Sequence, residues 1–168
     1  MKSIKYKMRK AILDLKTCFY CRMEHGKIYE ISELINQEDK SHNNCRCTFE
    51  LLKALQAGTA TKKGINGADW WLKYTGKLPN YYITKEEATN LGWKAYLGNL
   101  NQVAYGKMLT NGIYKNRNGH LPVAEGRVWY EADINYNSGF RNDERIIFSN
   151  DGLIFVTYDH YLTFQEIV

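Results

Sequence analysis

A stretch near the C-terminal end of this 168-residue chain holds side chains suited to acid–base chemistry. Residues 127–161 contain the carboxylate Glu131, the arginines Arg141 and Arg145, and the histidine His160. A carboxylate and an imidazole can exchange protons with a phosphodiester, while guanidinium groups stabilise charge on its phosphoryl oxygens. This group predicts phosphodiester chemistry that needs no metal ion.

Each of these residues also has a purely structural interpretation. Glu131 can form a salt bridge with a nearby arginine, and His160 can be a surface histidine. Lys85 precedes two glutamates and can be a surface lysine or a phosphate-binding cation. The functional interpretation gains support because the group lies on consecutive elements, which an antiparallel meander brings together.

The surrounding patterns predict helices first and strands afterwards. Residues 67–74 form a short amphipathic pattern followed by Gly76, and Thr84 with Glu87 forms a capping box. A third helical segment is expected at 99–103. Residues 127–135, 145–149 and 153–158 are strand-like, with a turn at 149–152. This order predicts an α+β domain.

The alternation in residues 127–135 gives one strand face an unusual composition. Arg127, Glu131 and Asp133 share that face, while Val128 and Ala132 belong to the other. Charged side chains on a sheet face have to pair with one another, or meet solvent or a ligand. This face is therefore the expected position of a site.

Charge and cysteine content divide the chain into two parts. The first 65 residues hold 13 Lys and Arg against 7 Asp and Glu, while the remaining 103 hold 10 against 11. All four cysteines lie in the first part. We predict a Cys-containing module at 1–57, a linker at 58–66 and a second domain at 67–168. No apolar run reaches the ~20 residues of a membrane helix, so no membrane partner is expected.

The cysteines follow the spacing C-x2-C and C-x-C, which offers four soft ligands to tetrahedral zinc: Cys18, Cys21, Cys45 and Cys47. His25 and His42 are alternative ligands. Two disulfides or four free thiols also fit this spacing. We favour structural zinc because a module with a small core needs a staple and no secretion signal indicates an oxidising compartment.

The local patterns of this module predict three elements. A hairpin is expected around His25–Gly26 with the C-x2-C pair at its base. Residues 31–35 suggest a helical turn. A short helix with one apolar face is expected after Thr48.

The cysteine segment resembles the phage Mu F-like minor head proteins, through K-T-C-F-Y-C-R-M-E-H-G-K and S-H-N-N-C-R-C. The resemblance covers about a third of the chain. It implies attachment to a phage head or to a toxin-delivery partner.

The C-terminal part resembles the barnase-like, guanyl-preferring bacterial ribonucleases. The shared motifs include K-L-P-N-Y-Y-I-T-K-E-E-A, N-R-N-G, G-R-V-W-Y-E-A-D-I-N-Y, S-G-F-R-N-D-E-R-I and D-H-Y. The resemblance implies the microbial ribonuclease fold, in which N-terminal helices pack on a five-stranded antiparallel sheet. It also implies endonucleolytic cleavage of single-stranded RNA without a cofactor.

Roles follow from the same motifs. By resemblance Glu131 is the general base and His160 the general acid, while Lys85, Arg141 and Arg145 bind phosphate. Substrate is expected to contact Asn116, Arg117, Asn118, Tyr114 and Tyr161. Arg127 and Asp151 match a structural ion pair. Asn118 replaces an acidic residue that reads guanine in the family, so base preference is open.

The expected product is a 2′,3′-cyclic phosphate. The resemblance further implies a toxin that is secreted or delivered by a non-classical route, acts in the target-cell cytoplasm and is blocked by an acidic barstar-like immunity protein. The alternatives are a catalytically weak RNA-binding or head-associated structural protein, and a nuclease of relaxed specificity.

Overall fold

A computed structural model describes residues 5–33 and 45–168, and the chain forms two compact units. The first unit comprises Met1–Lys53 and Asn116–Glu125, and the second comprises Ala54–Lys115 and Gly126–Val168. This division differs from the predicted one, because it lies at Lys53/Ala54 and assigns an internal loop to the first unit. Within the described residues, no helix is long and apolar enough to cross a membrane.

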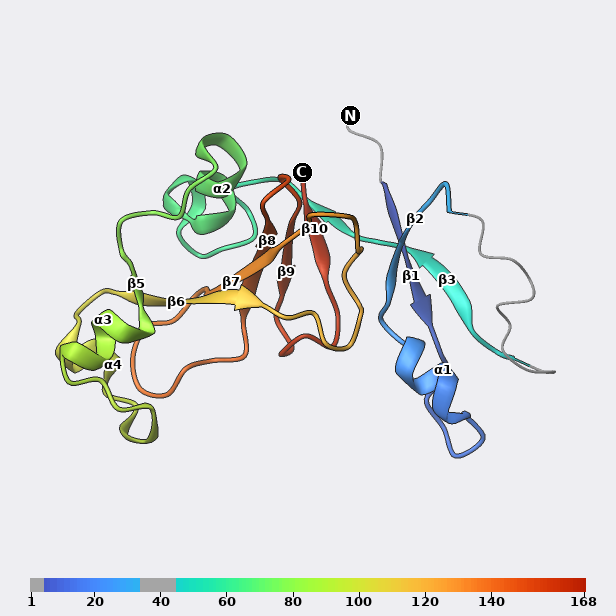
Figure 1. Ribbon diagram of the computed structural model, residues 1–168, viewed down its shortest axis with the longest axis horizontal. Helices are drawn as coiled ribbons and strands as arrows, with labels where there is room; N and C mark the ends of the chain where they lie inside the picture. Colours follow the sequence, from blue (N-terminus) through green and yellow to red (C-terminus); the bar gives the residue numbers. More distant parts are fainter. Residues whose placement is uncertain (1–4, 34–44) are drawn as a thin grey trace. The chain divides into compact units, whose positions relative to one another are not determined.

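The first unit is built on a three-stranded antiparallel sheet with the order β2-β1-β3 (Figure 1). Its strands are β1 (Tyr6–Lys10), β2 (Ile28–Glu30) and β3 (Thr48–Leu51), and its helix is α1 (Phe19–Glu24). The central strand β1 pairs Met8 with both Ile28 and Glu50.

Two local predictions for this unit are wrong. The segment before His25–Gly26 is helix α1 rather than a strand, so β2 pairs with β1 and not with its immediate neighbour. Residues 48–51 form a strand rather than a helix, because β3 pairs with the distant β1. The helical turn expected at 31–35 lies partly outside the described residues, as does His42.

The second unit is an α+β domain with a seven-stranded sheet in the order β4-β10-β9-β8-β7-β6-β5. The strands are β4 (Ala54–Leu55), β5 (Tyr82–Thr84), β6 (Met108–Tyr114), β7 (Trp129–Asp133), β8 (Arg145–Ser149), β9 (Ile154–Thr157) and β10 (Gln165–Ile167). Strands β6 to β10 form an antiparallel meander, and β4 and β5 pair in parallel with its two edges. The sheet therefore has two short strands beyond the five predicted.

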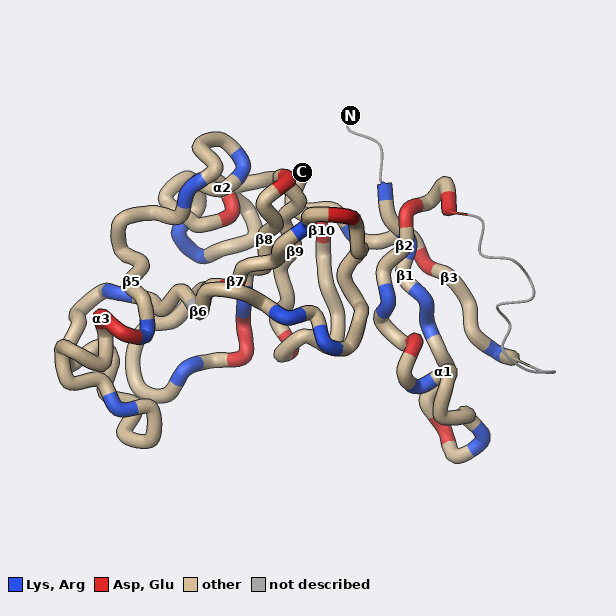
Figure 2. The backbone as a smooth tube through the Cα atoms, in the orientation of Figure 1, with Lys and Arg blue, Asp and Glu red and all other residues tan. Residues whose placement is uncertain are grey.

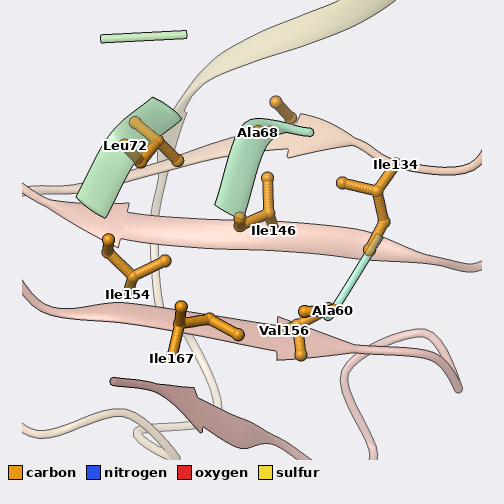
Figure 3. Close-up of a cluster of buried hydrophobic side chains, with 9 residues drawn as sticks. Ala60, Ala68, Leu72, Ile134, Ile146, Ile154, Val156 and Ile167 are labelled. Atoms are coloured by element: carbon orange, nitrogen blue, oxygen red, sulfur yellow. The ribbon is translucent and has the colours of Figure 1, made fainter. Parts of the chain in front are cut away.

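One face of this sheet packs against α2 (Ala68–Thr75). Figure 3 shows Leu72 and Ala68 of the helix over Ile146, Ile154 and other apolar side chains of the strands. Gly76 ends α2 at φ 69°, the left-handed conformation predicted from its position.

A second apolar cluster supports α3 (Lys85–Asn90) and α4 (Leu100–Val103), with Ala88, Leu100 and Leu109 almost fully buried. The predicted capping box is present, since Thr84 and Glu87 each accept a hydrogen bond from the other's backbone N–H. Short 3-10 turns lie at Gly64–Asn66 and Ala95–Leu97.

The segment predicted as a linker, residues 58–66, is fixed to the second unit. The fully buried carboxylate of Asp69 accepts hydrogen bonds from the backbone of Gly58 and Ala60 and from the Thr61 hydroxyl, at 2.7–2.9 Å. Tyr158 also donates to the carbonyl of Ala60. A small, polar, Gly-containing sequence is compatible with a flexible linker. Here the segment is ordered because the carboxylate of Asp69, outside the segment, accepts hydrogen bonds from its backbone N–H groups.

Candidate active site

Glu131 lies in the middle of β7, on the sheet face opposite helix α2. In the strand register it stands between Gly112 of β6 and Ile147 of β8. The β6–β7 pairing shifts between Thr110 and Gly112, and Gly112 adopts φ 71°. Such irregularities re-aim side chains beside active sites. Here the irregularity lies beside Glu131.

Two strand positions further, Asp133 forms the centre of an ion triad with both predicted arginines. Arg141 donates to the two carboxylate oxygens of Asp133 at 2.8 and 2.7 Å, and Arg145 Nε lies 3.1 Å from Asp133 Oδ1. Asp133 is completely buried, whereas the Arg141 side chain retains 25% of its exposure. The hydrogen bonds that Arg141 donates to Asp133 raise the pKa of Arg141.

The loop before β8 provides further hydrogen bonds that fix the Arg145 side chain. It donates to the carbonyls of Asn142 and Glu144 at 2.6 and 2.7 Å. Charged residues of both signs lie in the connection that leads into β8 (Figure 2). The two guanidinium groups are therefore fixed before any ligand binds, which is what stabilisation of a developing charge requires. The central role of Asp133 was missed, although alternation placed it on the face of Glu131.

The phenol of Tyr161 donates a hydrogen bond of 2.6 Å to Glu131 Oε2. Its ring stacks on Tyr114, with centroids 5.3 Å apart. Burial and the bond to Glu131 hold the pKa of Tyr161 well above its usual value of 10, and burial with the charge of Glu131 raises the pKa of Tyr114 to about 12. Both phenols thus stay protonated at neutral pH.

A tight turn presents His160 next to this pair. His160 and Tyr161 both have left-handed backbones, with φ of 55° and 70°. The hydroxyl of Thr157 accepts from the Tyr161 N–H, and Asp159 accepts from Thr157 and Thr163. The imidazole is exposed and its centroid lies 4.9 Å from that of Tyr161. Non-glycine residues with positive φ often occur at functional sites.

Five predicted residues are thus linked to Glu131 or to its neighbours. Tyr161 binds Glu131, Tyr114 and His160 lie beside Tyr161, and Arg141 and Arg145 share Asp133. After the bonds with Asp133, the negative charge of Glu131 contributes to the raised pKa of Arg141, while the charge of Arg145 opposes the raised pKa of Tyr161. Lys85 is exposed at the first position of α3. The predicted ion pair is confirmed, with Arg127 and Asp151 2.8 Å apart.

The remaining predicted substrate contacts lie in the loop that belongs to the first unit. Asn116 is half-buried, and Arg117 and Asn118 are exposed. Asn116 has φ 44° and Gly119 has φ 64°, so the loop has a defined, tight backbone.

A model of the ribonuclease family matches residues 70–168. The chain belongs to the ribonuclease family. A ribonuclease from Heyndrickxia coagulans is 53% identical over 100 residues, which cover 60% of this chain and 91% of that protein. Ribonucleases from Bacillus intermedius and Bacillus pumilus are 53% identical over 100 residues as well, and the matched region spans 61% of each.

The matched residues 70–168 thus form an endoribonuclease domain, and RNA is its substrate. Family members need no metal for catalysis. The match also explains why the sheet face around Glu131 is polar. Burying charged side chains there costs free energy, which a site that binds RNA can justify and a purely structural core cannot. The matched residues begin inside α2, so the cysteine module lies outside them.

Three cysteines of the first unit lie close enough together to bind one zinc ion. The sulfur atoms of Cys21, Cys45 and Cys47 all lie within 4.8 Å of one another, and Cys21 and Cys45 are 3.6 Å apart. Tetrahedral zinc with Zn–S bonds of about 2.3 Å separates its sulfurs by about 3.8 Å. Three of the four predicted ligands therefore fit a metal ion.

Cys18 is the fourth predicted ligand and lies slightly apart. Its sulfur accepts a hydrogen bond from the Cys21 N–H at 3.4 Å, where it caps helix α1. Cys18 lines the same small pocket as Cys21 and Cys47. His25 is less suitable, because its Nδ1 accepts from the Ala11 N–H at 3.1 Å. All four thiols are free of disulfides.

Proposed function

We propose that the protein is an endoribonuclease toxin that cleaves single-stranded RNA by transphosphorylation, with Glu131 as general base and His160 as general acid. One observation carries the proposal: Glu131 lies on a sheet face with a fixed arginine pair and is hydrogen-bonded to Tyr161, next to His160. This set supplies a base, an acid and charge stabilisation within one site.

In the proposed reaction, Glu131 takes the proton of the ribose 2′-OH as that oxygen attacks the adjacent phosphorus. The bond from phosphorus to the 5′-oxygen breaks, and protonated His160 gives its proton to this leaving oxygen. The products are a 2′,3′-cyclic phosphate and a free 5′-OH. Water can then open the cyclic phosphate, with the proton roles of the two residues reversed.

Phosphate binding is assigned to Lys85, Arg141 and Arg145. Arg141 has the geometry best suited to this role, because its Nε and one terminal nitrogen bind Asp133 while a quarter of its side chain stays exposed. Arg145 is more deeply buried and acts mainly through its charge. Tyr161 orients the Glu131 carboxylate and contacts the substrate with its ring face.

Base binding is assigned to Asn116, Arg117 and Asn118, together with Tyr114. The exposed amide of Asn118 can donate and accept hydrogen bonds but offers no carboxylate to a guanine edge. This supports a weaker guanine preference than an acidic residue would give.

The first test is incubation of defined RNA with the full-length protein in EDTA, followed by analysis of the product ends. We expect cyclic phosphate ends for the wild type and a loss of about 10²–10⁴-fold in rate for Glu131→Gln and for His160→Gln. Glu33→Gln, an exposed acid of the first unit, is the matched control and should leave the rate unchanged. Intact RNA would favour the non-catalytic RNA-binding alternative.

The toxin role rests on the resemblance of the cysteine segment to phage head proteins and on the cationic site. We propose secretion or delivery by a non-classical route, action in the target-cell cytoplasm and control by an acidic barstar-like immunity protein. Expression of the wild type in a bacterial cytoplasm should arrest growth, and Glu131→Gln should not. Equal growth of the two strains would contradict this role.

For the first unit we propose a structural zinc site formed by Cys21, Cys45, Cys47 and Cys18. Burial opposes ionisation of the Cys45 thiol, but hydrogen bonds with Cys47 and Cys21 outweigh it and lower the pKa of Cys45 to about 7. Burial raises the pKa of Cys47 to about 11, so zinc would have to displace the proton of that thiol. Zinc would hold α1 against the segment before β3. The purified chain should contain one zinc ion and four thiols that react only after chelation. Absence of zinc with four freely reactive thiols would contradict the site.

A further inference from the structure

The loop assigned to base recognition, Asn116–Glu125, folds as part of the cysteine module and not of the catalytic unit. We propose that the module is a built-in scaffold that fixes this loop and thereby sets the affinity of the ribonuclease for the RNA base. The inference rests on the proposed base-binding role of the loop. It gives the module an enzymatic purpose in addition to any delivery role.

The first contact is between backbones. Strand β2 is at the edge of the three-stranded sheet, with one side paired to β1. On its free side the Ile28 N–H donates a hydrogen bond of 2.8 Å to the carbonyl of His120. The Ile28 side chain is 3% exposed. The loop thus satisfies an edge strand that would otherwise offer an unpaired donor.

The second observation is the burial of a leucine in the loop. Leu121 is 1% exposed, although it lies in an irregular segment without strand or helix. The Asn116 side chain binds the backbone of Leu121 on both sides: its Oδ1 accepts from the Leu121 N–H at 3.1 Å and its Nδ2 donates to the Leu121 carbonyl at 2.9 Å. The buried leucine therefore anchors the residue that begins the loop.

The tip of the loop remains available. Arg117 and Asn118 are exposed, and Asn118 is oriented by His120, whose backbone N–H donates to its Oδ1 at 3.3 Å. The side chains of these two residues are also 3.0 Å apart. His120 thus links the module to the recognition residue through adjacent groups. Because the anchor is buried and the tip is open, the module orders the loop without covering its tip.

An ordered loop binds a base more tightly, because it loses its conformational entropy when the protein folds and not when RNA binds. Loosening the anchor should therefore raise KM and leave kcat almost unchanged, since Glu131 and His160 belong to the other unit. A defect in the catalytic sheet would instead lower kcat.

The test uses full-length variants from both sides of the contact, Leu121→Ala in the loop and Ile28→Ala in the module. Exposed neighbours provide matched controls, Val123→Ala and Ile31→Ala. With dinucleoside phosphates that carry guanine or adenine before the scissile bond, we expect KM to rise about tenfold for the better base in both test variants, which corresponds to about 1.4 kcal/mol. The kcat should stay within about twofold, and the controls should match the wild type.

Hydrogen exchange separates the possible failures. The Ile28 amide should be protected in the wild type, and the loop amides should exchange faster in both test variants. If the wild type cleaves no RNA, the proposed function fails, and exchange alone then decides whether the module holds the loop. If the loop loosens while KM and base preference are unchanged, the inference is overturned. It is also overturned if kcat falls in place of a rise in KM.

Discussion

At the scale of single residues, the hydrogen bond between Tyr161 and Glu131 makes a specific prediction about pH. Since the pKa of Tyr161 lies above its usual value, the phenol keeps its proton and its bond to Glu131 from pH 7 to beyond pH 9. Tyr161→Phe should therefore lower kcat by about tenfold, equivalent to one hydrogen bond to a charged group. The ratio of wild-type to variant kcat should be constant across this range. A ratio that changes steeply with pH would contradict the proposed orienting role.

A second residue, Asp133, is predicted to make a large contribution to the stability of the fold. Asp133→Asn removes the charge that pairs with Arg141 and Arg145 inside the sheet, so the free energy of unfolding should fall by about 3–5 kcal/mol. The matched control is Asp151→Asn, which breaks the pair with Arg127 at the surface and should cost about 0–1 kcal/mol. Denaturant titration measures both. Equal losses would show that the triad has no special role.

The same residues show what sequence reasoning can and cannot find. The motifs carry Glu131, Arg141, Arg145 and His160, and all four lie around one site. Asp133 was assigned only to a face, because alternation reports direction but not which charges meet across strands. The partners of Asp133 are Arg145 in β8 and Arg141 in the loop before β8. The local sequence around Asp133 does not reveal that these two arginines lie next to it in the folded protein.

At the scale of elements, local signals were reliable where they act within a few residues. The capping box at Thr84, the left-handed Gly76 and strand β8 all have the predicted form. Predictions failed where a distant partner decides the structure. Residues 48–51 became a strand because β1 pairs with them, and residues 58–66 became ordered because Asp69 binds them. The loop 116–125 joined the first unit for the same reason.

The turn that carries His160 is an element with its own pH dependence. Burial opposes the charge of Asp159, but hydrogen bonds from Thr163 and Thr157 outweigh it and lower the pKa of Asp159 below its usual 3.8. A lowered carboxyl pKa stabilises the fold above the usual pKa, and this stability is lost as pH falls through the folded value. The melting temperature of Asp159→Asn should be below wild type at pH 7, and the difference should narrow below about pH 4. A difference that widens in acid would contradict this account.

At the scale of the whole molecule, the two units should respond differently to loss of metal. The first unit has a small core, so removing a structural zinc should cost it much of its stability, since such ions contribute about 10–16 kcal/mol in small zinc modules. The second unit has its own core, and the family of ribonucleases that it matches needs no metal for catalysis. In hydrogen exchange, EDTA should expose amides of β1 and β2 while those of β7 to β9 remain protected. The Cys21→Ser variant should show the same pattern without EDTA.

If the module also holds the recognition loop, removing zinc should both unfold the first unit and raise KM. Loss of zinc should raise KM through the loop while kcat is retained, because the Ile28–His120 contact depends on the folded module and the reacting groups do not. Steady-state kinetics before and after chelation test this on the unmodified protein, and returning zinc should restore KM. A fall in kcat on chelation would instead couple the metal to the catalytic sheet. If KM stays constant although the amides of β1 and β2 become exposed, the module does not determine the affinity of the loop for RNA.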